Sequence, residues 1–277
     1  MSNKSTGERL EFYDFSEVTV EHLHRYAIAK NYVKNKRVLD IASGEGYGTY
    51  ILSKSAKSVV GVDIDKKSIE MASEKYKNSN LIFTEGSADN IPLENKSIDV
   101  VISFETIEHH DKHEEMLFEI ARVLKPDGIL IMSSPDKKYY SDITGFKNKF
   151  HVKELYFEEF KELIKRHFKS SNFYFQKSYN LNSYIYGVNC VETVVYSGSF
   201  NEVYKHELEP LYNIVIASQC FTDEMKPSIF DGSSITDLLI RARIKSNTEH
   251  IKQTTSYRIG NFLCFPFFCL KKIIKNG

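Results

Sequence analysis

The stretch Arg37–Asp65 reads RVLDIASGEGYGTYILSKSAKSVVGVDID, and it decides the fold of the chain. An apolar strand ends at Asp40, a turn has glycine at every second position from Gly44 to Gly48, and a second apolar strand ends at Asp63. Tyr50 to Leu52 lie in a predicted helix between the strands. Glycines let the backbone turn sharply close to a ligand, and a helix start offers unpaired N–H groups. An acid at the tip of the neighbouring strand can accept hydrogen bonds from a ribose diol. The stretch therefore predicts a nucleoside-binding unit.

The glycine spacing distinguishes between nucleoside cofactors. The dinucleotide fingerprint is G-x-G-x-x-G, whereas this turn has G-x-G-x-G and an acid four residues before its first glycine. This pattern resembles the first motif of class I S-adenosylmethionine-dependent methyltransferases. The alternative is a glycine-rich turn that binds no ligand. The resemblance implies that S-adenosylmethionine contacts a set of residues in and beside the turn: Asp40, Ala42, Ser43, Gly44, Gly46, Asp63 and Ile64.

Alternating strand and helix patterns continue after residue 65 and predict an α/β fold. We expect a helix over 68–76, strands over 81–85 and 98–103, a helix over 112–124, and a tight KPDG turn into a strand over 129–134. The run EIARVLKPDGILIMSSP strengthens the family resemblance, which covers residues 37–168. It implies a Rossmann-like, seven-stranded, mostly parallel sheet with helices on both faces. Strand six is predicted over 173–178, and an antiparallel strand seven over 211–218.

Two more groups of cofactor contacts follow from the resemblance. The loop after the third strand offers an acid to the adenine amino group, here Asp89, with Ser87 and Ala88 beside it. The junction FETIEHH follows the fourth strand at the carboxyl edge of the sheet, where open α/β folds bind ligands. There, Phe104 and Glu105 would line the methionine end of the cofactor.

Residues 1–36 form a separate N-terminal region in this interpretation. Helical spacing of apolar residues over 16–33 predicts a lid helix, with Ser16 as its N-cap. His22, His24 and Arg25 cluster on this helix. Arg25 could pair with the carboxylate of the bound cofactor through a charge-assisted hydrogen bond. The alternative is that the cluster forms a solvated polar face.

The methyltransferase domain is expected to span 37–244, with an insert at about 179–209 between strands six and seven. Six aromatic residues in the insert suit stacking on a carbohydrate, but equally suit a homodimer interface or plain packing. The remaining 245–277 form an apolar and then basic tail. This tail is too short to span a bilayer. It either docks onto protein or lies on the inner face of a membrane with its lysines toward anionic lipid.

Composition limits the class of protein and its surroundings. The 37 basic and 37 acidic residues cancel, which argues against an extended nucleic-acid contact. The N-terminal MSNKSTGERLEFYDF has no apolar core of a secretory signal, so a cytoplasmic protein is expected. Its cysteines, Cys190, Cys220, Cys264 and Cys269, include no C-x-x-C pair and are taken as ordinary thiols.

Methyl transfer to an alkyl hydroxyl requires a group that takes the proton. His109 and His110 lie at the predicted cofactor pocket, and His151 lies in a loop that commonly faces the acceptor. We expect the base among these three, with His110 and His151 slightly preferred to His109. Each could instead be a structural imidazole. Asp136 and Asp142 follow strand five, but they do not complete an oxygen-ligand set, so no metal is expected.

The methyl acceptor is the least defined part of the sequence-based interpretation. The segment GER, the run HLHRY, the tyrosine-rich insert and the tail resemble features of bacterial methyltransferases of surface glycan assembly. A sugar hydroxyl is therefore the leading expectation. A small molecule of a quinone or secondary-metabolite pathway is the alternative, and a non-catalytic cofactor-binding scaffold is another. A nicotinamide or nucleotide-sugar oxidoreductase is disfavoured because no Tyr-x-x-x-Lys pair occupies the expected position.

Overall fold

The computed structural model describes residues 16–189 and 194–263, and strands alternate with helices along its first half. The elements of this half are α1 (Glu17–Ala29), β1 (Arg37–Ile41), α2 (Tyr47–Ser53), β2 (Ser58–Asp63), α3 (Lys66–Lys75), β3 (Leu81–Glu85), β4 (Ile98–Phe104), the 3-10 turn η1 (Ile107–His109), α4 (His113–Val123), β5 (Leu124–Pro135) and the π-helical turn η2 (Lys138–Asp142). The later elements are α5 (Phe157–His167), β6 (Ser170–Tyr179), β7 (Asn182–Gly187), β8 (Val195–Gly198), β9 (Val203–His206), β10 (Tyr212–Ser218), β11 (Ser228–Phe230) and α6 (Ser233–Gln253).

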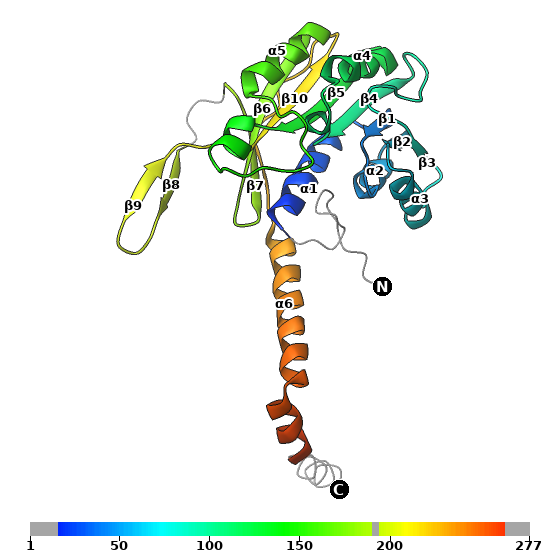
Figure 1. Cartoon of the computed structure of the whole chain (residues 1–277). Coiled ribbons are helices and arrows are strands. Elements are labelled where there is room, and N and C mark those ends of the chain that lie inside the picture. Colours follow the sequence, from blue (N-terminus) through cyan, green and yellow to red (C-terminus); the bar gives the residue numbers. More distant parts are fainter. Residues whose placement is uncertain (1–15, 190–193, 264–277) are drawn as a thin grey trace. The chain divides into compact units, whose positions relative to one another are not determined.

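One mixed sheet organises the chain up to residue 232 (Figure 1). Its strand order is β11-β7-β6-β10-β5-β4-β1-β2-β3. Neighbouring strands from β3 to β5 run parallel, and β10 is antiparallel to both β5 and β6. The order reverses between β1 and β4, so ligands are expected beyond the carboxyl ends of these strands. The Rossmann-like fold and its antiparallel seventh strand, here β10, are confirmed.

The sheet has nine strands rather than the expected seven, because part of the predicted insert returns to it. Asn180 and Leu181 have φ of 48° and 62°, which make the tight turn of a hairpin between β6 and β7. Three further pairs join β11 to β7. Of the insert expected at 179–209, the hairpin β8–β9 forms a separate two-stranded sheet. The strand predicted after the KPDG turn is also longer, because β5 already pairs with β4 at Leu124, before a register shift.

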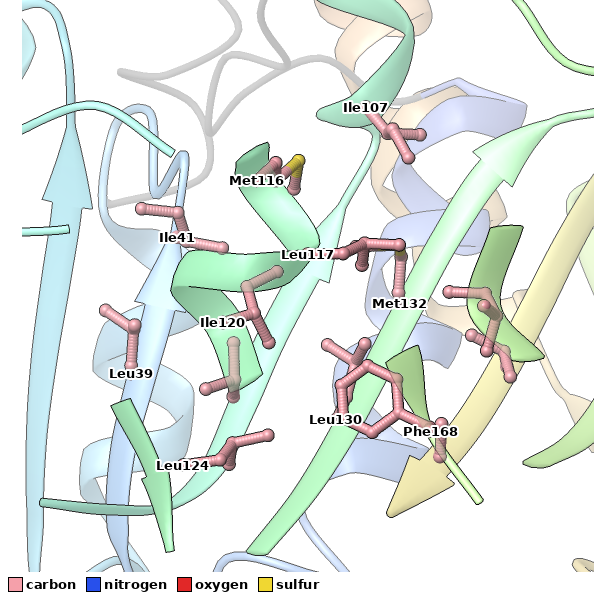
Figure 2. Packing of buried hydrophobic residues seen from close by; sticks show 14 of the residues in the cluster. Leu39, Ile41, Ile107, Met116, Leu117, Ile120, Leu124, Leu130, Met132 and Phe168 are labelled. Atoms are coloured by element: carbon pink, nitrogen blue, oxygen red, sulfur yellow. The ribbon is translucent and has the colours of Figure 1, made fainter. Parts of the chain in front are cut away.

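Helices cover both faces of the sheet, as the sequence predicts. Successive strand residues point to opposite faces: Leu39 packs with α4 and α5, whereas Val38 packs with α1 and α2. Figure 2 shows the first cluster, in which Met116 and Ile120 of α4 lie over the strands. The two apolar clusters fix the strand register, because a shift by one residue would exchange the two sets of side chains.

The compact units differ from the expected division of the chain. Within the expected N-terminal region 1–36, the described residues 16–36 are not separate, because α1 packs in the core and belongs to the unit that ends at Gly232. The second unit begins at Ser233, before the expected boundary at 244, because 233–253 is one helix. The end of the expected tail, from Cys264 onward and including Cys269 and Lys271, lies outside the described residues, as does Cys190.

None of the helices in the described part of the chain is both long and apolar enough to cross a membrane.

Candidate active site

A cavity of about 440 Å³ lies at the carboxyl edge of the parallel strands. Its volume is within the range of small-molecule sites, roughly 300–1,000 Å³. Its walls come from the turn after β1 and from the ends of β2, β3 and β4. Most of the predicted site residues line it: Ala42, Ser43, Gly44, Asp63, Ile64, Ser87, Ala88, Asp89, Phe104, Glu105, His109 and His110. Four do not, namely Arg25, Asp40, Gly46 and His151.

The turn after β1 needs glycine at Gly46 for its backbone conformation and at both Gly46 and Gly48 for lack of space. Gly46 has φ of 79°, and a Cβ there would lie 2.7 Å from the Phe83 ring and 2.8 Å from the Ala72 Cβ. At Gly48, a Cβ would lie 1.9 Å from Cζ of Tyr26. Ala42 has φ of 58°, a left-handed conformation that is costly for a residue with a side chain. The turn is thus a close-packed cradle at the start of α2, as a nucleoside ligand requires.

Asp63 at the end of β2 is held in place by backbone donors. Gly44 N donates to its Oδ2 over 2.8 Å, and Asp65 N donates to its Oδ1 over 2.9 Å. An ionised carboxylate has about four lone-pair sites, so it can accept several hydrogen bonds at once. Asp63 therefore fits the predicted role of accepting hydrogen bonds from ribose hydroxyls.

Asp89 also lines the cavity and remains ionised over a wide pH range. Lys112 donates to its Oδ2 over 2.5 Å, and Ser87 donates to its Oδ1. These hydrogen bonds, that of Lys112 first, lower the pKa of Asp89 to about 2. The carboxylate is thus an acceptor in a fixed position, as a contact to an adenine amino group requires.

Arg25 occupies a different place from the one predicted. Its side chain is buried, and Nη1 donates to Glu105 Oε1 over 3.3 Å and to Gln176 Oε1 over 3.1 Å. The guanidinium also lies 4.7 Å from the centre of the Tyr212 ring. Arg25 does not line the cavity, so its side chain is not placed to pair with the cofactor carboxylate as predicted. Its partner Glu105 lines the cavity instead.

The solvated polar face considered for the same cluster is wrong. His24 is buried, and its ring nitrogens lie 3.0 Å from the hydroxyls of Ser183 and Ser228. Burial, with a smaller effect of Arg25, lowers the pKa of His24 to about 4. His22 lines the cavity, and its Nδ1 lies 2.9 Å from the Tyr47 hydroxyl. The cluster therefore joins α1 to the sheet.

Asp40 lies beneath the turn rather than in the cavity. It is buried and accepts hydrogen bonds from the Thr49 hydroxyl over 2.7 Å and from the Tyr26 hydroxyl over 3.3 Å. Burial raises its pKa to about 7, although both hydrogen bonds oppose the change. Its contacts indicate that Asp40 supports the turn through α1 and α2.

The three candidate histidines fall into two pairs. His109 lines the cavity, and its ring centre lies 5.1 Å from that of His151, which comes from the loop before α5. His110 also lines the cavity but packs against His113 with ring centres 5.7 Å apart, and its Nε2 lies 3.2 Å from Met116 Sδ. Burial, with His113 as the next cause, lowers the pKa of His110. The geometry therefore places His109 and His151 at one site and His110 at another.

The acids considered for a metal do not form a site. Asp136 accepts hydrogen bonds from Asn213 Nδ2 and Lys138 N, and Asp142 accepts one from the Tyr156 hydroxyl. Within residues 16–189 and 194–263, one group has metal-ligand spacing, and it consists of Glu108, His109 and His151.

Glu108 is a member of this group that the sequence analysis did not single out. It is 1% exposed, and burial together with the charge of Glu105 raises its pKa well above the ordinary value. The sequence signal was its place beside His109 after β4.

Comparison with known proteins agrees with the geometry. A family model described as a methyltransferase domain matches residues 39–132. A Mycolicibacterium smegmatis protein named as an S-adenosylmethionine-dependent methyltransferase is 32% identical over 128 residues, 46% of this chain and 49% of the relative. Residues 39–132 therefore match a methyltransferase domain, and relatives of this segment are named as S-adenosylmethionine-dependent methyltransferases. These similarities indicate S-adenosylmethionine as the cofactor.

Two further comparisons define the extent of the similarity. A solved S-adenosylmethionine-dependent methyltransferase structure from Thermotoga maritima has a TM-score of 0.53 at 19% identity, covering 74% of this chain and 91% of that protein, which supports the fold. A fatty-acid O-methyltransferase of Mycolicibacterium smegmatis is 27% identical over 43% of this chain and 47% of its own length. The chain thus spans about half the length of the curated relatives it matches.

Proposed function

We propose that this protein transfers a methyl group from S-adenosylmethionine to a hydroxyl oxygen, with a sugar of surface glycan assembly as the leading acceptor. The observation that carries the proposal is that the glycine turn, two fixed acids, Asp63 and Asp89, and His109 line the same cavity. It combines a nucleoside site with a group able to accept a proton.

The chemistry needs alignment and proton removal. The sulfonium already activates the methyl group, so positioning of the hydroxyl opposite the sulfur supplies most of the acceleration. The hydroxyl must lose its proton as the new bond forms. His109 Nδ1 lies 3.1 Å from the Phe150 carbonyl oxygen, to which it can donate a hydrogen bond. In that tautomer Nε2 is the basic nitrogen. We therefore assign proton removal to the site of His109 and His151.

Two pairs of tyrosines support a sugar acceptor. The Tyr140 and Tyr212 ring centres lie 6.1 Å apart, and the Tyr184 and Tyr186 rings stack at 5.1 Å. Tyr140 also stacks on His151 at 5.3 Å. Aromatic faces with polar tips suit sugar rings, which have one apolar face and several hydroxyls.

A lipid hydroxyl or carboxyl is the second candidate acceptor. It is favoured by the relative named as a fatty-acid O-methyltransferase. The proposed oxygen chemistry is the same for both acceptors, and they differ in whether an apolar chain must be accommodated.

The first experiment is calorimetric titration with S-adenosylhomocysteine beside NAD. Selective binding of the homocysteine compound is expected, and binding of NAD alone would refute the proposal. Methyl transfer from labelled cofactor to glycans and to fatty acids then identifies the acceptor.

The proton-removal site is tested with His109→Ala, and His167→Ala is the matched control. His167 is paired with Glu114 and lies outside the cavity. We expect His109→Ala to bind S-adenosylhomocysteine normally while losing methyl transfer at least 100-fold, and His167→Ala to retain both. Cofactor binding without transfer to any acceptor would favour a non-catalytic scaffold.

A further inference from the structure

Glu108, His109 and His151 come together from two segments that the fold fastens to each other. The first two belong to η1, directly after β4, and the third lies in the loop before α5. Val152 N and Lys153 N donate to the Glu108 carbonyl oxygen over 2.8 Å and 3.1 Å. As a result, one ligand atom of each of the three side chains lies within 4.8 Å of the others.

The Glu108 carboxyl group has no hydrogen bond within the described residues. Both of its side-chain oxygens are buried and neither accepts a hydrogen bond, although His109 Nε2 lies 3.9 Å from Oε1. Burying a carboxylate without a partner costs several kcal/mol, and nearly all buried polar groups in native proteins have one. A cation bound at this place would provide the missing partner.

Each histidine has the second partner that metal-bound imidazoles usually have. His109 Nδ1 lies 3.1 Å from the Phe150 carbonyl oxygen, and His151 Nδ1 lies 2.5 Å from Glu154 Oε1. A ligating histidine typically donates its other ring N–H to a carbonyl or a carboxylate, which fixes the ring and the tautomer. The pattern leaves Nε2 of both rings as the ligand atom.

The spacing is close to that of a bound ion. Ligand atoms held at about 2.1 Å in a tetrahedron lie about 3.4 Å apart, so the 3.9 Å between His109 Nε2 and Glu108 Oε1 requires a small contraction. Asn148 Nδ2 lies 2.9 Å from His151 Nε2 and would have to turn away. The loop that carries Asn148 is exposed on one side, which allows this movement.

We propose that Glu108, His109 and His151 bind a divalent transition-metal ion of the Zn²⁺ class, with a further coordination position open to the cavity. Two imidazoles and one carboxylate are a zinc ligand set that leaves a position for a water or a substrate, and nitrogen ligands favour such ions over Mg²⁺. His109 lines the cavity, so we place the open position on the cavity side.

The role of the ion rests on the proposed function. An acceptor hydroxyl at the open position would have its pKa lowered by the cation. Its proton would then pass to solvent, and its oxygen would form the bond to the methyl carbon while the carbon–sulfur bond breaks. With the ion bound, His109 Nε2 acts as a ligand and no longer as the base.

The ion is tested by equilibrium dialysis of the whole chain against Zn²⁺ after chelation, with the bound metal counted per chain. One tightly bound ion is expected, weakened at least 100-fold in Glu108→Gln and in His151→Gln. His110→Gln is the control, because it removes a neighbouring histidine outside the group, and it should retain the ion. S-adenosylhomocysteine titration shows that each variant is folded. Failure of the wild type to bind Zn²⁺, or unchanged binding in both ligand variants, would overturn the proposal.

Two further results separate the metal from the function. In the Co²⁺-loaded protein we expect weak visible bands only, and an intense thiolate charge-transfer band would assign the metal to cysteines and overturn the site. Methyl transfer that persists after chelation would refute the role of the ion while the proposed function stands. Zinc binding without methyl transfer to any acceptor would leave the site standing and refute the function.

Discussion

Asp40→Asn should change how the stability of the protein depends on pH. The pKa of Asp40 is about 7 in the folded protein, against an ordinary value of 3.8. Between these values the folded state holds a proton that the unfolded state releases. The free energy of unfolding therefore falls as the pH rises from about 4 to about 7, and this contribution is constant above that. The difference, 7 minus 3.8, is about 3 pH units and corresponds to an upper bound of about 4 kcal/mol.

Denaturant unfolding at pH 5 and pH 8 measures the effect. About two of the three pH units lie between pH 5 and 7. From pH 5 to pH 8 the free energy of unfolding of the wild type should therefore fall by up to about 3 kcal/mol more than that of Asp40→Asn. Asn can still accept the hydrogen bond from Thr49. An exposed acid on α4, Glu115, provides the control, and Glu115→Gln should keep the wild-type profile. Parallel profiles for the wild type and Asp40→Asn would refute the reasoning.

Three other substitutions test the glycine turn and the ion pair of Asp89 with Lys112. Gly48→Ala would place a Cβ 1.9 Å from the buried Tyr26 ring, so we expect a loss of about 1–3 kcal/mol in denaturant unfolding and weaker S-adenosylhomocysteine binding; unchanged values would contradict this packing. Ala42→Gly relieves a φ of 58° and should stabilise the protein by about 1 kcal/mol, whereas a loss of stability would show that the conformation is not strained. Lys112→Met removes the main cause of the low pKa of Asp89, so an NMR titration should show that pKa rising toward its ordinary range, and no change would exclude the ion pair.

The sequence predicts the parallel half of the sheet well because each strand is a short apolar run bounded by turn residues. The strand predicted over 81–85 is β3 without change, and the helix predicted over 112–124 is α4 within a residue of each end. The strand β7 was missed because its hairpin turns at Asn180 and Leu181. Tight hairpins are usually recognised in a sequence by Asn-Gly or Asp-Gly, and a leucine in the left-handed region gives no such signal.

The candidate site was predictable where its residues are close in sequence. The glycine turn and Asp63 lie within one motif, so spacing alone places them together. Arg25 was misplaced because its partners, Glu105 and Gln176, are 80 and 151 residues away in the chain. The proximity of His151 to Glu108 was missed for the same reason. The two residues are far apart in sequence and meet only when the loop before α5 folds onto η1.

The buried position of Arg25 bears on what can fold independently. The segment shared with the methyltransferase family model, residues 39–132, contains Glu105 but neither Arg25 nor Gln176. Excising it would leave Glu105 without its cation and would expose the apolar face that α1 covers. The segment that the family model matches is therefore smaller than the compact unit that ends at Gly232. A fragment that keeps the contacts of Arg25 has to include α1, β6 and β10.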